Sequence, residues 1–99
     1  METKLLWDEE SNTLYIKDHF YKSVWFESFG EMQKKIFSFK DAEINIDMTE
    51  CIFVSPTPFL SLLLTLKKAR VINNCLVNIY LPADDTDMKR IFLNYCAKE

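Results

Sequence analysis

The chain has 99 residues, of which 48% are hydrophobic, so it is long and apolar enough to bury the core of one compact domain. Its formal net charge is −3 and no run of basic residues breaks that balance, which argues against sequence-independent binding to nucleic acid or anionic membranes. The single glycine, Gly30, excludes glycine-rich phosphate loops, and the single histidine, His19, leaves little material for Ser-His or Cys-His catalysis.

The first third of the chain predicts a β-hairpin followed by a helix. Two short apolar runs, 5–7 and 14–16, surround a polar stretch and indicate the hairpin. Ser23 can cap the helix, because its hydroxyl can accept a hydrogen bond from an amide of the first turn. Apolar residues then recur at steps of four and three and share one side of the helix. They are Trp25, Phe29, Met32, Ile36 and Phe39.

The rest of the chain alternates strands with helices. Residues 43–54 alternate in polarity and then end in an apolar triplet, which predicts one strand that becomes fully buried near its end. A helix from Ser55 to about Ile72 and a strand over 75–81 follow. Beyond Pro82, the chain predicts a last helix whose apolar face consists of Met88, Ile91, Phe92 and Tyr95.

The predicted element order is β-β-α-β-α-β-α, which defines an α/β fold with a mixed four-stranded sheet and helices. We expect parallel pairing in the second half and an antiparallel edge at the hairpin. One domain spans residues 1–99. Because no helix-ending glycine precedes Glu99, the sequence leaves open whether this domain is the N-terminal part of a longer protein.

Three cysteines, Cys51, Cys75 and Cys96, have no zinc-knuckle spacing and cannot all pair within one chain. We interpret them as small buried residues of a protein in a reducing compartment. The chain starts without a secretory-signal pattern, and its longest apolar run, 59–66, is far shorter than the roughly 20 residues of a membrane span. The sequence therefore predicts a soluble, cytoplasmic protein without a metal or cofactor.

The run from Asp47 to Phe59, DMTECIFVSPTPF, resembles the signature of the STAS family, the sulfate-transporter and anti-sigma-factor-antagonist domains. That family carries the pattern D-L-S-G-V-x-F-I-D-S-S-G-L at a strand-to-helix junction, and the two patterns align without a gap. The predicted element order and the domain length also resemble this family. The resemblance implies a non-enzymatic switch module that docks onto a kinase-like ATPase or another protein with the helix after the signature and the loop before it.

The chain departs from the family pattern at its centre. Pro56 occupies the usual phospho-acceptor position, between Ser55 and Thr57, and Pro58 replaces a glycine. Proline has no hydroxyl, so the resemblance implies a member without the usual serine phospho-switch. The residues themselves predict a helix capped by Ser55, with prolines in its first turn that lack amide hydrogens. We therefore expect a rigid junction that binds phosphate poorly.

The helix that follows predicts the candidate interaction surface. Apolar residues on one side form the core, and uncharged polar residues with Lys68 are expected to form a stripe on the opposite side. The flanking residues, Leu60, Leu64 and Val71, either pack against a neighbouring helix or edge a face that a partner buries. The candidate partner-binding residues are Ser55, Thr57, Leu60, Ser61, Leu64, Thr65 and Lys68. We expect a charge at Ser61 or Thr65 to abolish partner capture with little change in thermal stability.

Other polar residues are better explained by structure than by chemistry. Asp47, without a second convergent acid, is interpreted as an organiser of its loop. Asp84, Asp85 and Asp87 precede a predicted helix and are interpreted as capping residues rather than as a cation site. His19 lies beside aromatic residues and is expected to be solvated or stacked.

These observations favour a non-enzymatic interaction module that regulates or scaffolds a partner, such as an anti-sigma-type kinase-like ATPase. We expect no enzyme activity, because no acid–base or nucleophile pair converges. The second hypothesis is a sensor that binds a nucleotide or lipid in a cavity between helices and sheet. A thermal-shift screen with both ligand types separates the two hypotheses, because a clear shift favours the sensor.

Overall fold

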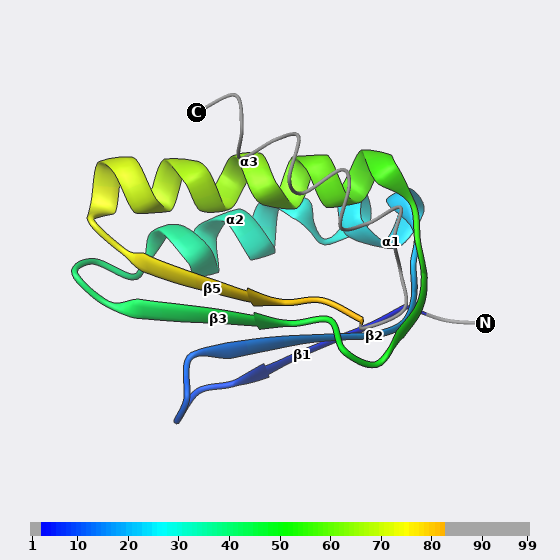
Figure 1. The fold of residues 1–99 in the computed structure, drawn as a ribbon. Coiled ribbons are helices and arrows are strands. Elements are labelled where there is room, and N and C mark those ends of the chain that lie inside the picture. Colours follow the sequence, from blue (N-terminus) through cyan, green and yellow to red (C-terminus); the bar gives the residue numbers. More distant parts are fainter. Residues whose placement is uncertain (1–2, 83–99) are drawn as a thin grey trace.

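The computed structural model of the chain describes residues 3–82. Its elements are β1 (Thr3–Asp8), β2 (Thr13–Phe20), α1 (Lys22–Glu27), α2 (Phe29–Phe37), β3 (Glu43–Asp47), β4 (Cys51–Val54), α3 (Pro56–Asn73) and β5 (Leu76–Tyr80). The three helices form one layer on one face of the sheet (Figure 1). No helix in this part of the chain is both long and apolar enough to cross a membrane.

The sheet combines antiparallel and parallel pairing, as the sequence predicts. Strands β1 and β2 form the antiparallel hairpin at one edge. Strand β2 pairs in parallel with β3, and β3 pairs in parallel with β5, which gives the order β1-β2-β3-β5. Strand β4 lies off this path and pairs in parallel with β2. The mixed α/β class is therefore confirmed.

The single strand predicted over 43–54 is two strands, so the described sheet has five strands where the sequence predicted four. Strand β3 pairs with the first half of β2, and β4 pairs with the second half. Between them the chain turns, and the Asp47 carboxylate accepts hydrogen bonds from the Thr49 amide (3.0 Å) and hydroxyl (2.6 Å). This local bonding competes with a continuous ladder. The expected full burial is also wrong at Ile52, which is 69% exposed.

The predicted helix over 23–39 is also divided, into α1 and α2. The break falls at Ser28, whose backbone angles are φ −98° and ψ 2°. The helix begins at Lys22, one residue before the predicted cap Ser23. The predicted apolar side is nevertheless confirmed, because Trp25 and Ile36 are fully buried and the other three members pack against the core.

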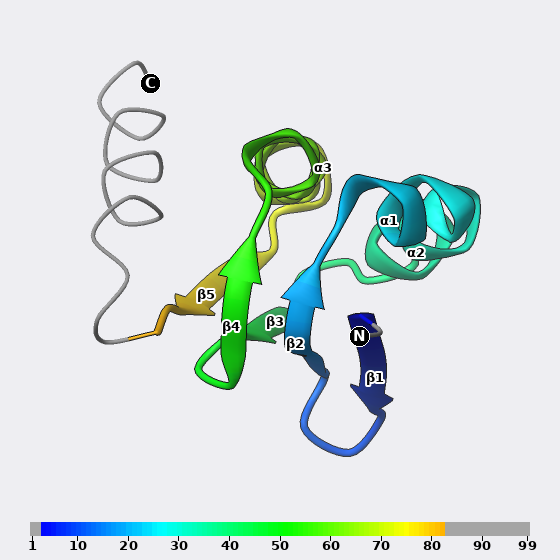
Figure 2. The same cartoon turned by 90° about the vertical axis from the view of Figure 1, so that its right-hand side faces the viewer.

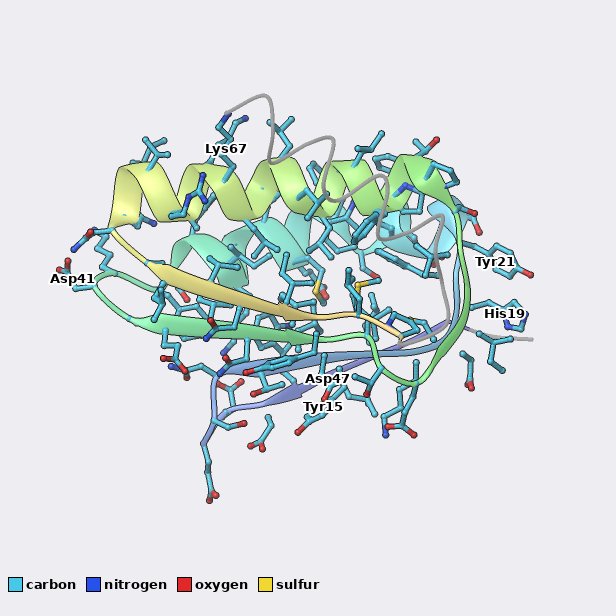
Figure 3. All side chains as sticks on the ribbon, viewed as in Figure 1. Tyr15, His19, Tyr21, Asp41, Asp47 and Lys67 are labelled. Atoms are coloured by element: carbon cyan, nitrogen blue, oxygen red, sulfur yellow. The ribbon has the colours of Figure 1, made fainter. Side chains whose placement is uncertain are left out.

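The two faces of the sheet differ in polarity. On the helix side, Leu14, Ile16, Ile44 and Ile46 are fully buried. Polar residues lie on the other side. Two of them, on neighbouring strands, are joined by a hydrogen bond in which the side-chain amide of Asn78 donates to the side-chain oxygen of Asn45 over 3.0 Å. Tyr15 and Asp47, which are register partners on β2 and β3, also lie on this face (Figure 3). The domain therefore has two layers, with its core between the sheet and α1–α3.

Left-handed backbone positions in the described chain are occupied by asparagine and aspartate. They are Asn12, Asp18, Asp41 and Asn74, with φ between 51° and 64°. Three of these positions also make side-chain hydrogen bonds to residues far along the chain. The side-chain amide of Asn12 donates to the Glu43 carbonyl over 3.2 Å, and the side-chain amide of Asn74 donates to the Asp41 carboxylate over 2.9 Å. Asn74 ends α3 as its left-handed C-cap.

The end of α3 and the next strand agree with the sequence prediction to within one or two residues. Helix α3 ends at Asn73, β5 spans Leu76–Tyr80, and the chain is no longer a strand at Pro82. The predicted last helix, with its aspartate caps Asp84, Asp85 and Asp87, lies outside the described residues.

Candidate protein-interaction surface

The β4–α3 junction has the predicted backbone shape. Ser55 is extended (φ −72°, ψ 137°) at the N-cap position, and the helix starts at Pro56. The amide of Ser55 donates to the Phe20 carbonyl over 3.0 Å, which ties the junction to the end of β2. The predicted capping bond from the Ser55 hydroxyl is wrong, since its side chain caps no amide. A capping oxygen bonds the second or third helical amide, and Pro58 removes the third.

The residues of the first turn differ in exposure. Pro56 and Thr57 are exposed, Ser55 is half-buried, and Pro58 is fully buried. The first backbone hydrogen bond of the helix is donated by the Phe59 amide to the Ser55 carbonyl over 3.4 Å. Two of the first three helical positions lack an amide hydrogen, as the sequence implies. Weak phosphate binding at this junction stays a prediction.

The predicted stripe of exposed hydroxyls is wrong at its centre. Thr65 is only 3% exposed, and its hydroxyl donates to the Ser61 carbonyl over 3.0 Å. Ser61 is half-buried, and its hydroxyl accepts a hydrogen bond from the indole nitrogen of Trp25 over 2.8 Å. Ser61 therefore faces α1, and Thr65, one turn later on the same side of α3, is buried as well.

The buried indole explains this arrangement. Trp25 is fully buried between Phe20 and Phe29, with ring centroids 5.6 and 5.7 Å away. A buried indole N–H needs an acceptor, and Ser61 supplies it from the facing helix. The sequence contained this signal, because a tryptophan predicted to be buried on one helix requires a polar partner on another.

The side of α3 that points away from the core carries exposed apolar residues. Leu60 is 42% exposed, Leu64 is 49% exposed and Val71 is 68% exposed. Together with the exposed residues Thr57 and Lys68, they follow one another at steps of three and four. At about 100° per residue this spacing places all five on one side of the helix. We call this set, Thr57, Leu60, Leu64, Lys68 and Val71, the α3 ridge.

The α3 ridge retains part of the predicted surface and changes the rest. Thr57, Leu60, Leu64 and Lys68 were predicted and are exposed, whereas Ser61 is half-buried and Thr65 is buried. Val71, predicted only as a flanking residue, is more exposed than either leucine. The ridge is thus mainly apolar, with one hydroxyl and one cation, rather than a polar stripe with apolar edges.

Elsewhere in the described residues, the side chains that could take part in catalysis or metal binding have structural roles. The Asp47 carboxylate organises its turn, which confirms that interpretation. His19 stacks on Tyr21 with ring centroids 5.4 Å apart, and both project from the end of the sheet where α3 begins (Figure 3). Cys51 and Cys75 are buried, as predicted, and Cys96 lies outside the described residues. Within residues 3–82, no three metal-ligating side chains form a group.

Comparison of the chain with models of protein families, with curated proteins and with solved structures gives no match. The case for a function is therefore carried by the residues and their geometry.

Proposed function

We propose that the protein is a non-enzymatic interaction module that regulates or scaffolds a protein partner through the α3 ridge. The observation that carries this proposal is the exposure of Leu60, Leu64 and Val71 in one line on the side of α3 away from the core. Apolar residues of a helix normally face another element of the fold, and here the sheet and the neighbouring helices cover the core positions of α3 and the side of Ser61, but leave the ridge on the other side in water. A partner would bury this ridge.

The chemistry of the ridge suits a protein partner. Leucine and valine side chains supply apolar area, and removing them from water contributes about 25 cal/mol per Å². The centre of a protein interface is depleted in charge, which fits a ridge whose single charged member, Lys68, lies near its end. A partner with an apolar groove and an acidic residue opposite Lys68 would match this surface.

The resemblance to STAS domains indicates which partner to test first. The helix after the signature is the docking element in that family, and α3 is the corresponding helix here. The resemblance therefore favours a kinase-like ATPase of the anti-sigma type. Because proline stands at position 56, we propose that docking is not controlled by the usual serine phosphorylation.

The test is capture of a candidate ATPase of this class by the intact protein and by two variants. Leu64→Glu places a charge at the centre of the ridge and should weaken capture at least tenfold, because a buried carboxylate at an interface is costly. Leu6→Glu is the matched control, since Leu6 is 51% exposed on β1, in another part of the domain. Equal capture by both variants would refute the ridge as the docking surface.

A second measurement tests the lost phospho-switch. The protein is incubated with the candidate ATPase and ATP, and intact mass is recorded. We expect no stoichiometric phosphate on Ser55 or Thr57, because Ser55 is half-buried and both residues are held in a proline-rigidified helix start. One phosphate per chain on either residue would contradict this part of the proposal and would leave the docking surface to be judged by the Leu64 variant.

A further inference from the structure

The two edge strands of the sheet differ in charge. Figure 2 shows β1 and β5 at opposite edges. Strand β1 contains Lys4 and Asp8 and leads into an acidic turn, and charges of this kind discourage another strand from pairing with an edge. Strand β5 contains no charged residue, and none occurs from Val71 to Pro82, although 27% of the chain is charged. Strand β5 is therefore the edge without this protection.

The hydrogen bonds of β5 show which of its backbone groups remain at the open edge. The Leu76 amide donates to the Ala42 carbonyl, just before β3, over 2.9 Å. The Tyr80 carbonyl accepts a hydrogen bond from the residue that follows β3 over 2.8 Å. Successive residues of a strand direct their backbone groups to opposite sides, so every second residue from Leu76 bonds toward β3. The N–H and C=O groups of Val77 and Ile79 point outward, and no strand within residues 3–82 pairs with them. We call these four groups the β5 edge.

Two copies of the β5 edge fit each other in one antiparallel register. When Asn78 lies opposite Asn78 of a second copy, Val77 lies opposite Ile79 of that copy, and Ile79 lies opposite its Val77. Both of these are hydrogen-bonded pairs, so all four outward groups of each copy are bonded. The two central asparagines form the closer, non-hydrogen-bonded pair, and amide side chains that face each other can bond because each is both donor and acceptor.

The side chains agree with this register. On the face without helices, Leu76 would lie opposite Tyr80 of the second copy, and these residues are 60% and 51% exposed. Pairs of aliphatic and aromatic residues across neighbouring strands stabilise a sheet. On the helix face, the half-buried Val77 and Ile79 would cover each other across the contact. Pairing would therefore remove apolar surface from water on both faces of the sheet.

The charge of the chain favours a second copy as the occupant of this edge. The formal net charge is −3, so two copies repel each other over most of their surfaces. Repulsion is weakest where neither copy carries a charge, and the stretch 71–82 meets this condition in both. An acidic or basic peptide would find no opposite charge there, whereas a second copy brings the same uncharged strand.

We propose that the protein forms a symmetric homodimer in which the β5 edges of two copies pair antiparallel, centred on Asn78, and join the two sheets into one. All residues of the α3 ridge lie on α3 and none lies on β5, so this inference is independent of the partner proposed for the ridge. The dimer would carry two α3 ridges.

Sedimentation velocity of the full-length protein, from low micromolar to millimolar concentration, tests the dimer, and two charge variants test its register. Leu76→Lys combined with Tyr80→Lys places like charges opposite each other in both outer pairs. Leu76→Glu combined with Tyr80→Lys places opposite charges there. Both positions are exposed, so neither variant removes core packing, and circular dichroism checks that each is folded.

The two charge variants should differ although both change the same positions. We expect the wild type to dimerise as its concentration rises and the like-charge variant to raise the dissociation constant at least about tenfold, because like charges directly opposite destabilise a strand pair. The opposite-charge variant should stay within about threefold of the wild type. A wild type that stays monomeric throughout, or equal dissociation constants for the two variants, would overturn the proposal.

Leu64→Glu separates this dimer from self-association through the α3 ridge. Leu64 lies on the ridge and outside β5, so this variant should leave the dissociation constant within about twofold of the wild type. Loss of the dimer in this variant, with the dimer retained by the like-charge variant, would place the contact on the ridge and contradict the β5 edge.

Amide hydrogen exchange read by NMR locates the pairing at single residues. The Val77 and Ile79 amides should exchange at least about tenfold more slowly at a concentration where the protein is dimeric than where it is monomeric. The Leu76 amide, which is already bonded to the Ala42 carbonyl, serves as the internal reference. Unchanged exchange at both outward amides in a dimeric sample would overturn the proposed contact.

Discussion

Two sides of α3, the side that carries Ser61 and Thr65 and the α3 ridge, reverse the usual relation between polarity and exposure. On the side that carries Ser61 and Thr65, both hydroxyl-bearing residues are largely removed from water. On the ridge, Leu60 and Leu64 are 42% and 49% exposed. The comparison teaches that a helix's neighbours, and not its own polarity pattern, decide which side is buried.

The physical origin of the difference is the Trp25 indole. A leucine at position 61 would fill space against α1 but would leave the buried N–H of Trp25 without its acceptor. A serine on the inner side therefore stabilises the helix contact. No such requirement applies to the ridge. Its leucines are exposed, and the described residues do not bury them, so they contribute little to the stability of this domain.

The largest expected effect is a difference in the free energy of unfolding between alanine variants of two leucines in α3. Leu62→Ala removes a fully buried side chain and should lower the free energy of unfolding by about 2–5 kcal/mol. Leu64→Ala, on the ridge, should lower it by less than about 1 kcal/mol, because half of that side chain is already in water. Urea denaturation of both variants measures the difference, and equal losses would show that the ridge is covered.

An intermediate effect is expected on the hydroxyl side. Ser61→Ala leaves the Trp25 indole without its acceptor and should destabilise the protein by about 1–3 kcal/mol. Thr57→Ala, which removes an exposed hydroxyl from the same helix, should change stability by no more than about 0.5 kcal/mol. Thermal unfolding of both variants is the measurement. A neutral Ser61 variant would show that water replaces the serine oxygen.

The same geometry corrects the stability expected for charged variants. Thr65→Lys was expected to leave stability nearly unchanged, but Thr65 is 3% exposed, so the ammonium group would have to enter a buried position. Loss of partner capture by this variant would therefore report unfolding rather than a lost contact. Variants on the ridge are the ones that report binding.

The smallest expected effect concerns Lys68. Lys68→Ala should change the free energy of unfolding by less than about 0.5 kcal/mol, because the residue is exposed. If the partner places an acidic residue opposite it, the variant should also show a weaker dependence of capture on salt concentration. Capture by the wild type and by the variant at low and high salt measures this contribution. Identical salt dependence would exclude Lys68 from the interface.

Much of the fold follows from the sequence because its apolar periods are clear. The hairpin, the apolar side of α1 and α2, and the bounds of α3 were predictable from residues such as Trp25, Ile36 and Pro56. The breaks at Ser28 and after Asp47 were not, since each depends on local backbone geometry that leaves the apolar pattern almost unchanged.

The candidate site was less predictable than the fold. A helical wheel correctly separates Phe59 and Leu62 from the ridge, but it does not show which flank meets another helix. That information is tertiary: it depends on where α1 lies beside α3. The leucines of the ridge were identified from sequence, and the hydroxyls were assigned to the wrong environment for this reason.

The asparagine and aspartate turns have a consequence for protein engineering. Glycine usually relieves a residue held at positive φ, so replacing Asn12 or Asn74 would seem a simple route to a sturdier domain. In this chain each replacement would also remove a side-chain hydrogen bond, to the Glu43 carbonyl in one case and to the Asp41 carboxylate in the other. Variants intended to raise the thermal stability of the domain should therefore keep asparagine at both turns.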